Sequence, residues 1–211
     1  MRYVVAAVLA LFCSVPAFAQ RSFDLTGNVV WLDPTGGGTF GDLFDPVDLD
    51  VDSDMGFGLA ANVFFNERLS TEFAIARVEN ETSVRRRATG AAAAGGNLEM
   101  TPITAVLQYH FAPNGFIDPY IGAGGAYMLF DFSEGQGVTG VDQIDVDDDI
   151  GFVVNAGIGI KLGGRLGLNV DAKYVPVDAA ASGVIVSSDE ESFTRIEVSP
   201  IIISAGVSLR F

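Results

Sequence analysis

The chain has 211 residues, a formal net charge of −15 and a mean hydropathy of +0.35. This acidity argues against nucleic acid as a partner, because a nucleic-acid-binding surface needs basic residues to meet the phosphates. The hydropathy is high for a soluble protein, yet no run of about 18 apolar residues follows the N-terminal segment, so the sequence offers no transmembrane helix.

Residues 1–19 are predicted to be a cleavable signal peptide. Arg2 gives a positive start, residues 4–12 are apolar, and Ala17, Phe18 and Ala19 form an A-x-A cleavage site. The single cysteine, Cys13, lies inside this segment, so the mature chain is expected to have no disulfide. The predicted organisation is therefore a signal peptide at 1–19 followed by one domain at 20–211.

The last stretch, residues 196–211, alternates between two kinds of side chain. One parity is apolar: Ile201, Ile203, Ala205, Val207, Leu209 and Phe211. The other is small or polar: Ser204, Gly206, Ser208 and Arg210. A period of two with these faces indicates a strand between lipid and an aqueous or polar interior, closed by an aromatic residue at the interface. An edge strand of a soluble sandwich is the alternative for this stretch alone.

Seven further segments are predicted strands, at 23–32, 55–65, 69–84, 97–111, 119–132, 150–162 and 165–177. Short turns follow the second, fourth and sixth strands. Long loops, expected to be solvated, follow the first, third, fifth and seventh, at 33–54, 85–96, 133–149 and 178–194. This alternation of connection lengths is typical of outer-membrane barrels, which have short periplasmic turns and long outer loops. We therefore predict an all-β fold, an eight-stranded antiparallel transmembrane β-barrel.

Four stretches resemble the OmpW family of eight-stranded outer-membrane barrels. They are P-I-T-A-V-L-Q-Y-H-F-A-P at 102–113, D-P-Y-I-G-A-G-G-A-Y at 118–127, L-N-V-D-A-K-Y-V-P-V-D at 168–178 and I-I-I-S-A-G-V-S-L-R-F at 201–211. The resemblance implies a narrow barrel with a hydrophobic interior, linked to the uptake or diffusion of small hydrophobic molecules. The acidic loops and the arginines at 85–87 depart from the family's pattern, so no loop-borne function is carried over.

Parity divides the predicted lumen into two zones. The zone expected near the outer side is apolar and is the candidate ligand-binding region: Val30, Leu32, Val153, Val175, Val177, Val198 and Ile202. The zone expected near the periplasm is a charged plug: Asp24, Glu72, His110, Lys161, Asp171, Lys173 and Arg210. Acids and bases are nearly matched there, so they can pair and close an eight-stranded bore. The alternative is that the valines only pack an inert core, and a solidly filled upper zone would contradict solute uptake.

Pro176 and Pro200 fall in the predicted seventh and eighth strands, where each removes a ladder hydrogen bond. They form a candidate lateral seam through which a solute could leave sideways into the membrane. The alternative is a strand end or bulge at the rim.

No metal site or cofactor is expected, because counting from Asp50 places Met55 and Ala61 where a calcium loop needs Gly and Glu. The aspartates at 48–54 and 145–149 are interpreted as a solvated acidic rim, with diffuse binding of divalent cations that bridge to lipopolysaccharide phosphates as the alternative. His110 is the only histidine, and its expected place low in the lumen favours a hydrogen bond in the plug over catalysis. The arginines at 85–87 are interpreted equally well as contacts to lipid phosphates or as partners of the acidic loops.

The sequence thus predicts a non-enzymatic protein of the bacterial outer membrane that binds or passes small hydrophobic molecules. The alternative is a structural or surface-interaction protein with a filled, non-conducting barrel. The expected partners are outer-membrane lipid, lipopolysaccharide, small hydrophobic solutes and the barrel-assembly machinery, which would recognise the C-terminal strand.

Overall fold

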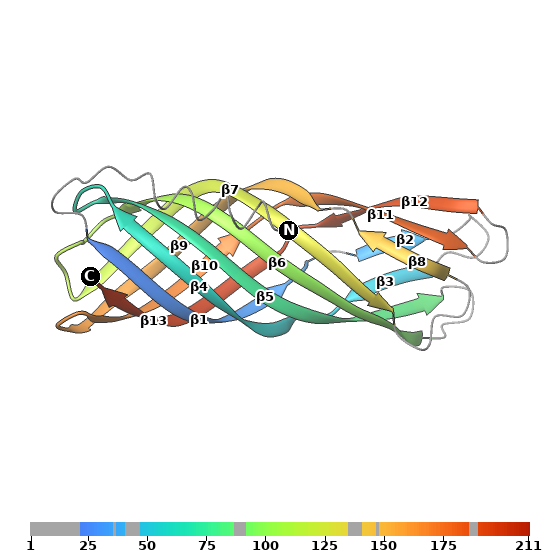
Figure 1. Cartoon of the computed structure of the whole chain (residues 1–211), viewed down its shortest axis with the longest axis horizontal. Helices are drawn as coiled ribbons and strands as arrows, with labels where there is room; N and C mark the ends of the chain where they lie inside the picture. Colours follow the sequence, from blue (N-terminus) through green and yellow to red (C-terminus); the bar gives the residue numbers. More distant parts are fainter. Residues whose placement is uncertain are drawn as a thin grey trace.

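The computed structural model describes residues 22–35, 37–40, 47–86, 92–134, 141–146, 148–185 and 190–211. The predicted signal peptide at 1–19 lies outside them. Among the described residues, eight strands form the wall of a barrel (Figure 1). They are β1 (Phe23–Asp33), β4 (Asp54–Phe64), β5 (Leu69–Arg86), β6 (Ala92–His110), β7 (Ile117–Glu134), β9 (Asp149–Gly163), β10 (Leu166–Tyr174) and β13 (Ile201–Arg210).

The barrel is closed because β1 pairs antiparallel with both β4 and β13. The β1–β13 pairing runs from Asp24 opposite Arg210 to Asp33 opposite Ile201. All the other neighbouring barrel strands pair antiparallel as well, which leaves none of the eight with a free edge along the wall. The predicted eight-stranded antiparallel barrel is confirmed.

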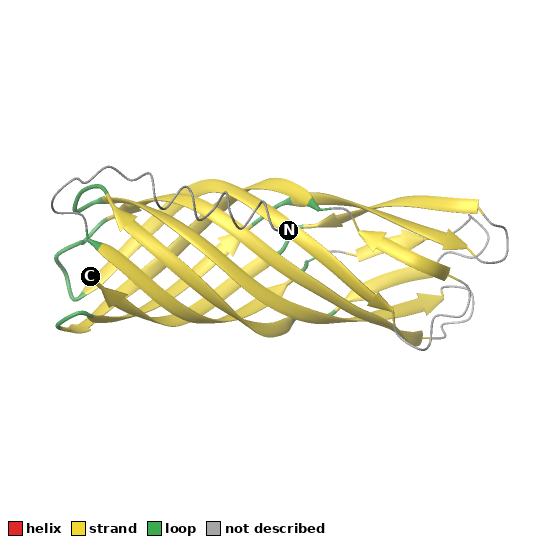
Figure 2. Cartoon of the chain, viewed as in Figure 1, coloured by secondary structure: helices red, strands yellow, loops and turns green. Residues whose placement is uncertain are grey.

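The two ends of the barrel differ (Figure 2). We call the end with the short connections at 65–68, 111–116 and 164–165 the turn end; Phe211 lies there too, where it hydrogen bonds to Phe23. The tightest of these turns contains Gly163 and Gly164, with φ angles of 118° and 59°, in the left-handed region that favours glycine. We call the opposite end, where β5, β6 and β7 extend furthest, the loop end.

The sequence predicts long solvated loops at the loop end. This prediction is corrected, because much of the length of these segments forms strands. β2 (Gly37–Phe40) and β3 (Val47–Val51) form a hairpin, and β3 pairs with the extended end of β5. β8 (Val141–Val146), β11 (Val177–Ile185) and β12 (Glu190–Val198) form a separate three-stranded sheet. Pairing with neighbouring strands satisfies the backbone groups of these polar segments, which composition alone did not indicate.

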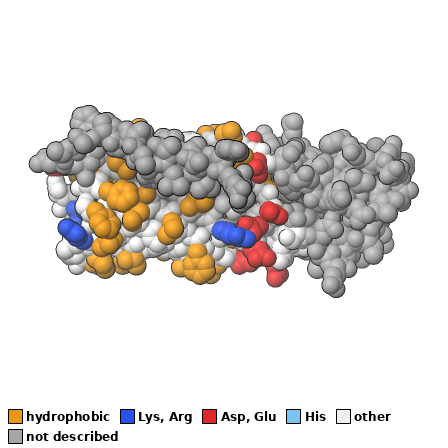
Figure 3. All heavy atoms as spheres, in the orientation of Figure 1, with side chains coloured by type: hydrophobic (Ala, Val, Ile, Leu, Met, Phe, Trp, Pro, Cys, Tyr) orange, Lys and Arg blue, Asp and Glu red, His pale blue; other side chains and the backbone are white. Residues whose placement is uncertain are grey.

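The side chains that face away from the lumen form an apolar belt. Phe57 is 78 % exposed, and Ile203, Val207 and Leu209 are 41 %, 52 % and 40 % exposed, as the parity of the last stretch predicts. Figure 3 shows hydrophobic side chains spread over the visible wall and acidic side chains gathered toward the loop end. An exposed apolar band of this kind suits contact with lipid acyl chains. Within the described residues, no helical segment has the length and hydropathy that a membrane-spanning helix requires.

Pro176 and Pro200 do not lie inside barrel strands, which corrects their expected placement. Pro176 lies between the end of β10 at Tyr174 and the start of β11 at Val177, and Pro200 lies between β12 and β13. Both strands therefore break at the same level, where the Val175 N–H still donates to the Pro200 carbonyl at 3.1 Å. Proline has no N–H to continue the ladder, which is a physical reason for the break.

Candidate functional site: a lumen with two zones

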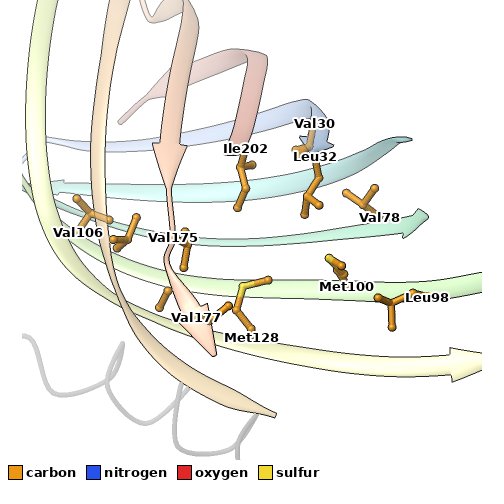
Figure 4. Packing of buried hydrophobic residues seen from close by; sticks show 12 residues of the cluster. Val30, Leu32, Val78, Leu98, Met100, Val106, Met128, Val175, Val177 and Ile202 are labelled. Carbon is orange, nitrogen blue, oxygen red and sulfur yellow. The ribbon is translucent and has the colours of Figure 1, made fainter. Parts of the chain in front are cut away.

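Apolar side chains fill the half of the lumen toward the loop end (Figure 4). We call the buried group there the apolar cluster: Val30, Leu32, Val78, Leu98, Met100, Val106, Ala126, Met128, Val153, Val175, Val177 and Ile202. It contains six of the seven predicted apolar lumen residues. The seventh, Val198, has a side chain outside the described set.

The apolar cluster is closely packed in this structure. Leu32, Met100 and Met128 are completely buried, and every member of the cluster is at most 5 % exposed. The described side chains therefore leave no open chamber of solute size at this level. This filled state is the one expected to contradict solute uptake and to favour an inert core, so uptake requires that these side chains move aside. Methionine is the most adaptable apolar side chain, so the two methionines are the members that could move with least strain.

The sequence pattern did not identify Met100 and Met128, which lie at diagonal positions on the neighbouring strands β6 and β7. β6 and β7 pair with Met100 opposite Phe130 and Pro102 opposite Met128. On β7, the Gly and Ala run gave no contrast between faces, so its inward set was not identified from sequence. The known outward parity of Ile103 on β6 could have placed Met100 inside.

Below the apolar cluster, Lys173 joins two carboxylates across the bore. Its Nζ lies 2.9 Å from Glu72 Oε1 on β5 and also contacts Asp171 on its own strand. Asp171 Oδ2 further accepts hydrogen bonds from Tyr120 Oη at 3.1 Å and from Asn155 Nδ2 at 2.9 Å. All of these side chains are at least nine-tenths buried, so each charge depends on these partners to offset the cost of leaving water.

Asp24 and Arg210 form a second ion pair at the turn end. Arg210 donates from Nε to Asp24 Oδ1 at 2.7 Å and from Nη2 to Oδ2 at 2.6 Å, a bidentate arrangement. The guanidinium also lies 4.8 Å from the centre of the Phe64 ring. Because the two residues are opposite each other in register, this pair ties together the first and last strands of the barrel.

His110 is held between Ser70 and Asp118. Its Nδ1 lies 2.9 Å from Asp118 Oδ2, and its Nε2 lies 2.8 Å from the Ser70 hydroxyl oxygen. This is the connectivity of a Ser-His-Asp relay, but Ser70 is 0 % exposed, so its hydroxyl is not presented to a substrate. The arrangement supports the plug hydrogen bond predicted for His110.

Lys161 differs from the other predicted plug residues in its partner. Its Nζ donates to the Pro113 carbonyl in a turn, so this lysine stabilises a connection at the turn end. The seven plug residues therefore form four separate groups rather than one network: Lys173 with Glu72 and Asp171, Asp24 with Arg210, His110 with Ser70 and Asp118, and Lys161 with the Pro113 carbonyl.

Small residues allow the large plug side chains to lie across neighbouring strands. A Cβ at Gly157 would lie 2.4 Å from Tyr120 Oη, and one at Gly206 would lie 2.2 Å from Asn28 Oδ1. Both contacts are too short for real atoms. Glycine is therefore required at 157 and 206, where the side chains of Tyr120 and Asn28 lie over the neighbouring strand.

Two cavities flank the plug. A vestibule of about 320 Å³ lies at the turn end, and its lining includes Asp24, His110, Asp118, Lys161 and Arg210. A cavity of about 30 Å³ lies deeper, between the plug and the apolar cluster. Within the described residues, no group of three or more His, Cys, Asp or Glu side chains is arranged to hold a metal ion.

Comparison with known proteins places this architecture among outer-membrane barrels. A model of the OmpW family matches residues 30–211. Outer membrane protein W of Vibrio cholerae is 27 % identical over 97 % of this chain and 96 % of its own length. Outer membrane protein AlkL of Ectopseudomonas oleovorans is 31 % identical over 52 % of this chain. The matched region covers 46 % of the length of that relative.

Solved structures give the same fold. The crystal structure of OprG from Pseudomonas aeruginosa superimposes with a TM-score of 0.79 at 20 % identity, covering 90 % of this chain and 95 % of that one. The structure of AlkL in lipid bilayers has a TM-score of 0.66 at 21 % identity, covering 94 % and 93 %. At these identities the likeness concerns the fold alone.

Proposed function

The chain belongs to the OmpW family of outer-membrane β-barrels, and from that premise we propose that it binds small hydrophobic molecules in its lumen and lets them pass. The observation that carries the proposal is the division of the lumen. An apolar half faces the loop end, and a plug of paired charges closes the half toward the turn end. A lumen so divided favours apolar solutes and opposes a continuous column of water.

The proposed route starts at the loop end, which we infer to face the cell exterior. A solute enters the apolar cluster by displacing Met100 and Met128 and stops at the ion pairs of Lys173. It then leaves sideways, beside the break at Pro176 and Pro200. The support for this exit is local: Val175 and Val177, which flank Pro176, both belong to the apolar cluster.

A filled, non-conducting barrel with a structural or surface role is the second candidate. The close packing of the apolar cluster favours it. The two candidates differ in whether the side chains of the apolar cluster move aside to admit a solute. A measurement of solute uptake through the barrel distinguishes them.

The test is uptake of an apolar fluorescent probe into liposomes that contain the folded barrel. Met100→Ala and Met128→Ala, made separately, each remove side-chain volume from the proposed route and should speed uptake several-fold. Met55→Ala is the matched control, because Met55 is exposed on the outer wall and its truncation leaves the lumen unchanged. No uptake by the wild type or by either lumen variant, with all proteins folded, would establish the filled barrel instead.

The outer wall near the loop end supports a proposal about lipid partners. Glu79, Glu99 and Asp131 lie opposite one another on β5, β6 and β7, and exposed Arg77 pairs with Glu99. We propose that this level meets the lipopolysaccharide head groups, with Arg77 directed to their phosphates.

We also propose that the barrel-assembly machinery recognises β13, the C-terminal strand with alternating apolar and polar side chains.

A further inference from the structure

The cavity of about 30 Å³ lies where the two zones of the lumen meet. Its lining is apolar on one side, with Val30 and Ile202 of the apolar cluster together with Pro102. On the other side it is polar: Thr26, Asn28, Glu72, Thr104, Lys173 and Ser204. A volume of about 15 Å³ already holds one water-sized group, so the cavity accommodates a hydroxyl but nothing much larger.

Two oxygens of this lining lack hydrogen bonds. Thr104 Oγ1 and Asn28 Oδ1 are buried and have no hydrogen-bond partner among the residues that the structure describes. Thr104 itself is more than nine-tenths buried. Glu72 Oε1, in the same lining, carries the ion pair with Lys173 and is accounted for by it. A buried polar atom without a partner is costly, so these two oxygens mark a place for a water molecule or for a polar group of a ligand.

The chemistry of the two oxygens restricts the ligand group. An amide oxygen such as Asn28 Oδ1 only accepts hydrogen bonds, whereas the Thr104 hydroxyl either donates or accepts. A hydroxyl group is chemically compatible with both oxygens of this lining, since it can donate to Asn28 Oδ1 and accept from Thr104. An aldehyde, ester or ether oxygen has no proton to donate and would leave Asn28 unsatisfied. A carboxylate would bring negative charge to Glu72 and Asp171, where Lys173 is the paired cation.

We propose that this cavity is the head-group site for amphipathic solutes that end in a hydroxyl, such as primary alcohols, with the chain directed into the apolar cluster. This inference rests on the proposed function and narrows its substrate class from apolar molecules in general. Without such a solute, a water molecule satisfies the same two oxygens. At equal chain length, we expect the alcohol to bind most tightly, the alkane less tightly and the carboxylate least.

The test compares 1-decanol, decane, decanal and decanoate, titrated at equal lipid mole fraction into the barrel in lipid nanodiscs. Nuclear magnetic resonance follows the Thr104 methyl group and the Asn28 side-chain amide. We expect 1-decanol to shift these signals at about tenfold lower mole fraction than decane, the ratio that one additional hydrogen bond to a buried group confers. Contacts between the Thr104 methyl and the first methylene of decanol should accompany the shift.

Three variants make the test specific. Thr104→Val keeps the volume and removes the hydroxyl, and it should reduce the tenfold preference toward one. Thr104→Ser keeps a hydroxyl and should retain the preference. Ala74→Val adds volume to the cavity lining and should abolish the head-group contacts even if Thr104→Val proves hard to fold.

The outcomes are distinguishable. Equal binding of decanol and decane, unchanged in Thr104→Val, would overturn the head-group site and leave passage of apolar solutes intact. If none of the four compounds shifts the resonances of any lumen residue in a folded wild-type barrel, both the site and the proposed function are overturned.

Discussion

The charged residues of the lumen differ in how much they contribute to the stability of the barrel. We expect Lys173 to contribute most, because it is the cation for both Glu72 and Asp171 in the middle of the barrel. Breaking a buried pair by removing one partner leaves the other charge desolvated and unpaired, at a cost of about 3–5 kcal/mol. Lys161, in contrast, donates to a backbone carbonyl at the turn end and leaves no carboxylate stranded when it is removed.

We therefore expect Lys173→Met to lower the free energy of unfolding by about 3–5 kcal/mol. Urea unfolding of the barrel in lipid vesicles measures this change. Lys161→Met is the matched control and should change stability by less than about 1 kcal/mol. Adding Glu72→Gln and Asp171→Asn to Lys173→Met removes the stranded charges and should recover most of the loss. A Lys173→Met barrel as stable as the wild type would show that the ion pairs do not hold the plug.

At the scale of elements, the most informative feature is the shared break between β10 and β11 and between β12 and β13. In an antiparallel pair, residues opposite each other at a hydrogen-bonded site exchange two bonds. The Val175 N–H donates to the Pro200 carbonyl, but Pro200 has no N–H to return to Val175. One ladder bond is therefore missing beside the apolar cluster, at the proposed exit.

Pro200→Val supplies the missing donor with a β-branched side chain of similar volume. We expect it to raise stability by about 0.5–1.5 kcal/mol, the usual net contribution of one hydrogen bond. If solutes leave at this seam, uptake of the apolar probe should also slow. An increase in stability with unchanged uptake would place the exit elsewhere, because the seam would then be closed without effect.

For the whole molecule, the closed ring and the outward apolar belt suit a membrane-spanning wall with the two ends in different compartments. The turn end has short connections and the loop end has extended strands and an additional sheet. In outer-membrane barrels the short turns lie on the periplasmic side. We therefore expect the loop end, the apolar half of the lumen and the acidic level of the wall to be directed to the outside.

This orientation is testable with single cysteines, because Cys13 in the predicted signal peptide is the only natural one. Ser133→Cys lies near the loop end, and Asn114→Cys lies in a connection at the turn end; both sites are exposed. A membrane-impermeant maleimide should label Ser133→Cys in intact cells and Asn114→Cys only after the outer membrane is permeabilised. Labelling of Asn114→Cys alone in intact cells would reverse the orientation and the proposed direction of entry.

The residue pattern was enough to predict the eight barrel strands, the family resemblance and the outward face. The side-chain period of a strand is two, so apolar alternation in residues such as Ile203 and Val207 identifies the lipid-facing parity without any knowledge of neighbours. Alternating short and long connections then order the strands. The signal peptide and the assignment of a ligand role to the valines remain predictions.

The contacts of the inward residues, in contrast, could be read only from the folded barrel. Tyr120 contacts Asp171, and Glu72 contacts Lys173, across strands far apart in sequence, and no local pattern indicates which inward side chains meet over the bore. The Gly and Ala run of β7 hid Tyr120 and Met128, because alternation is visible only when the two faces differ in polarity. The filled apolar cluster, the strands at the loop end and the unpaired oxygens of Asn28 and Thr104 likewise depend on the closure of eight strands around a narrow interior.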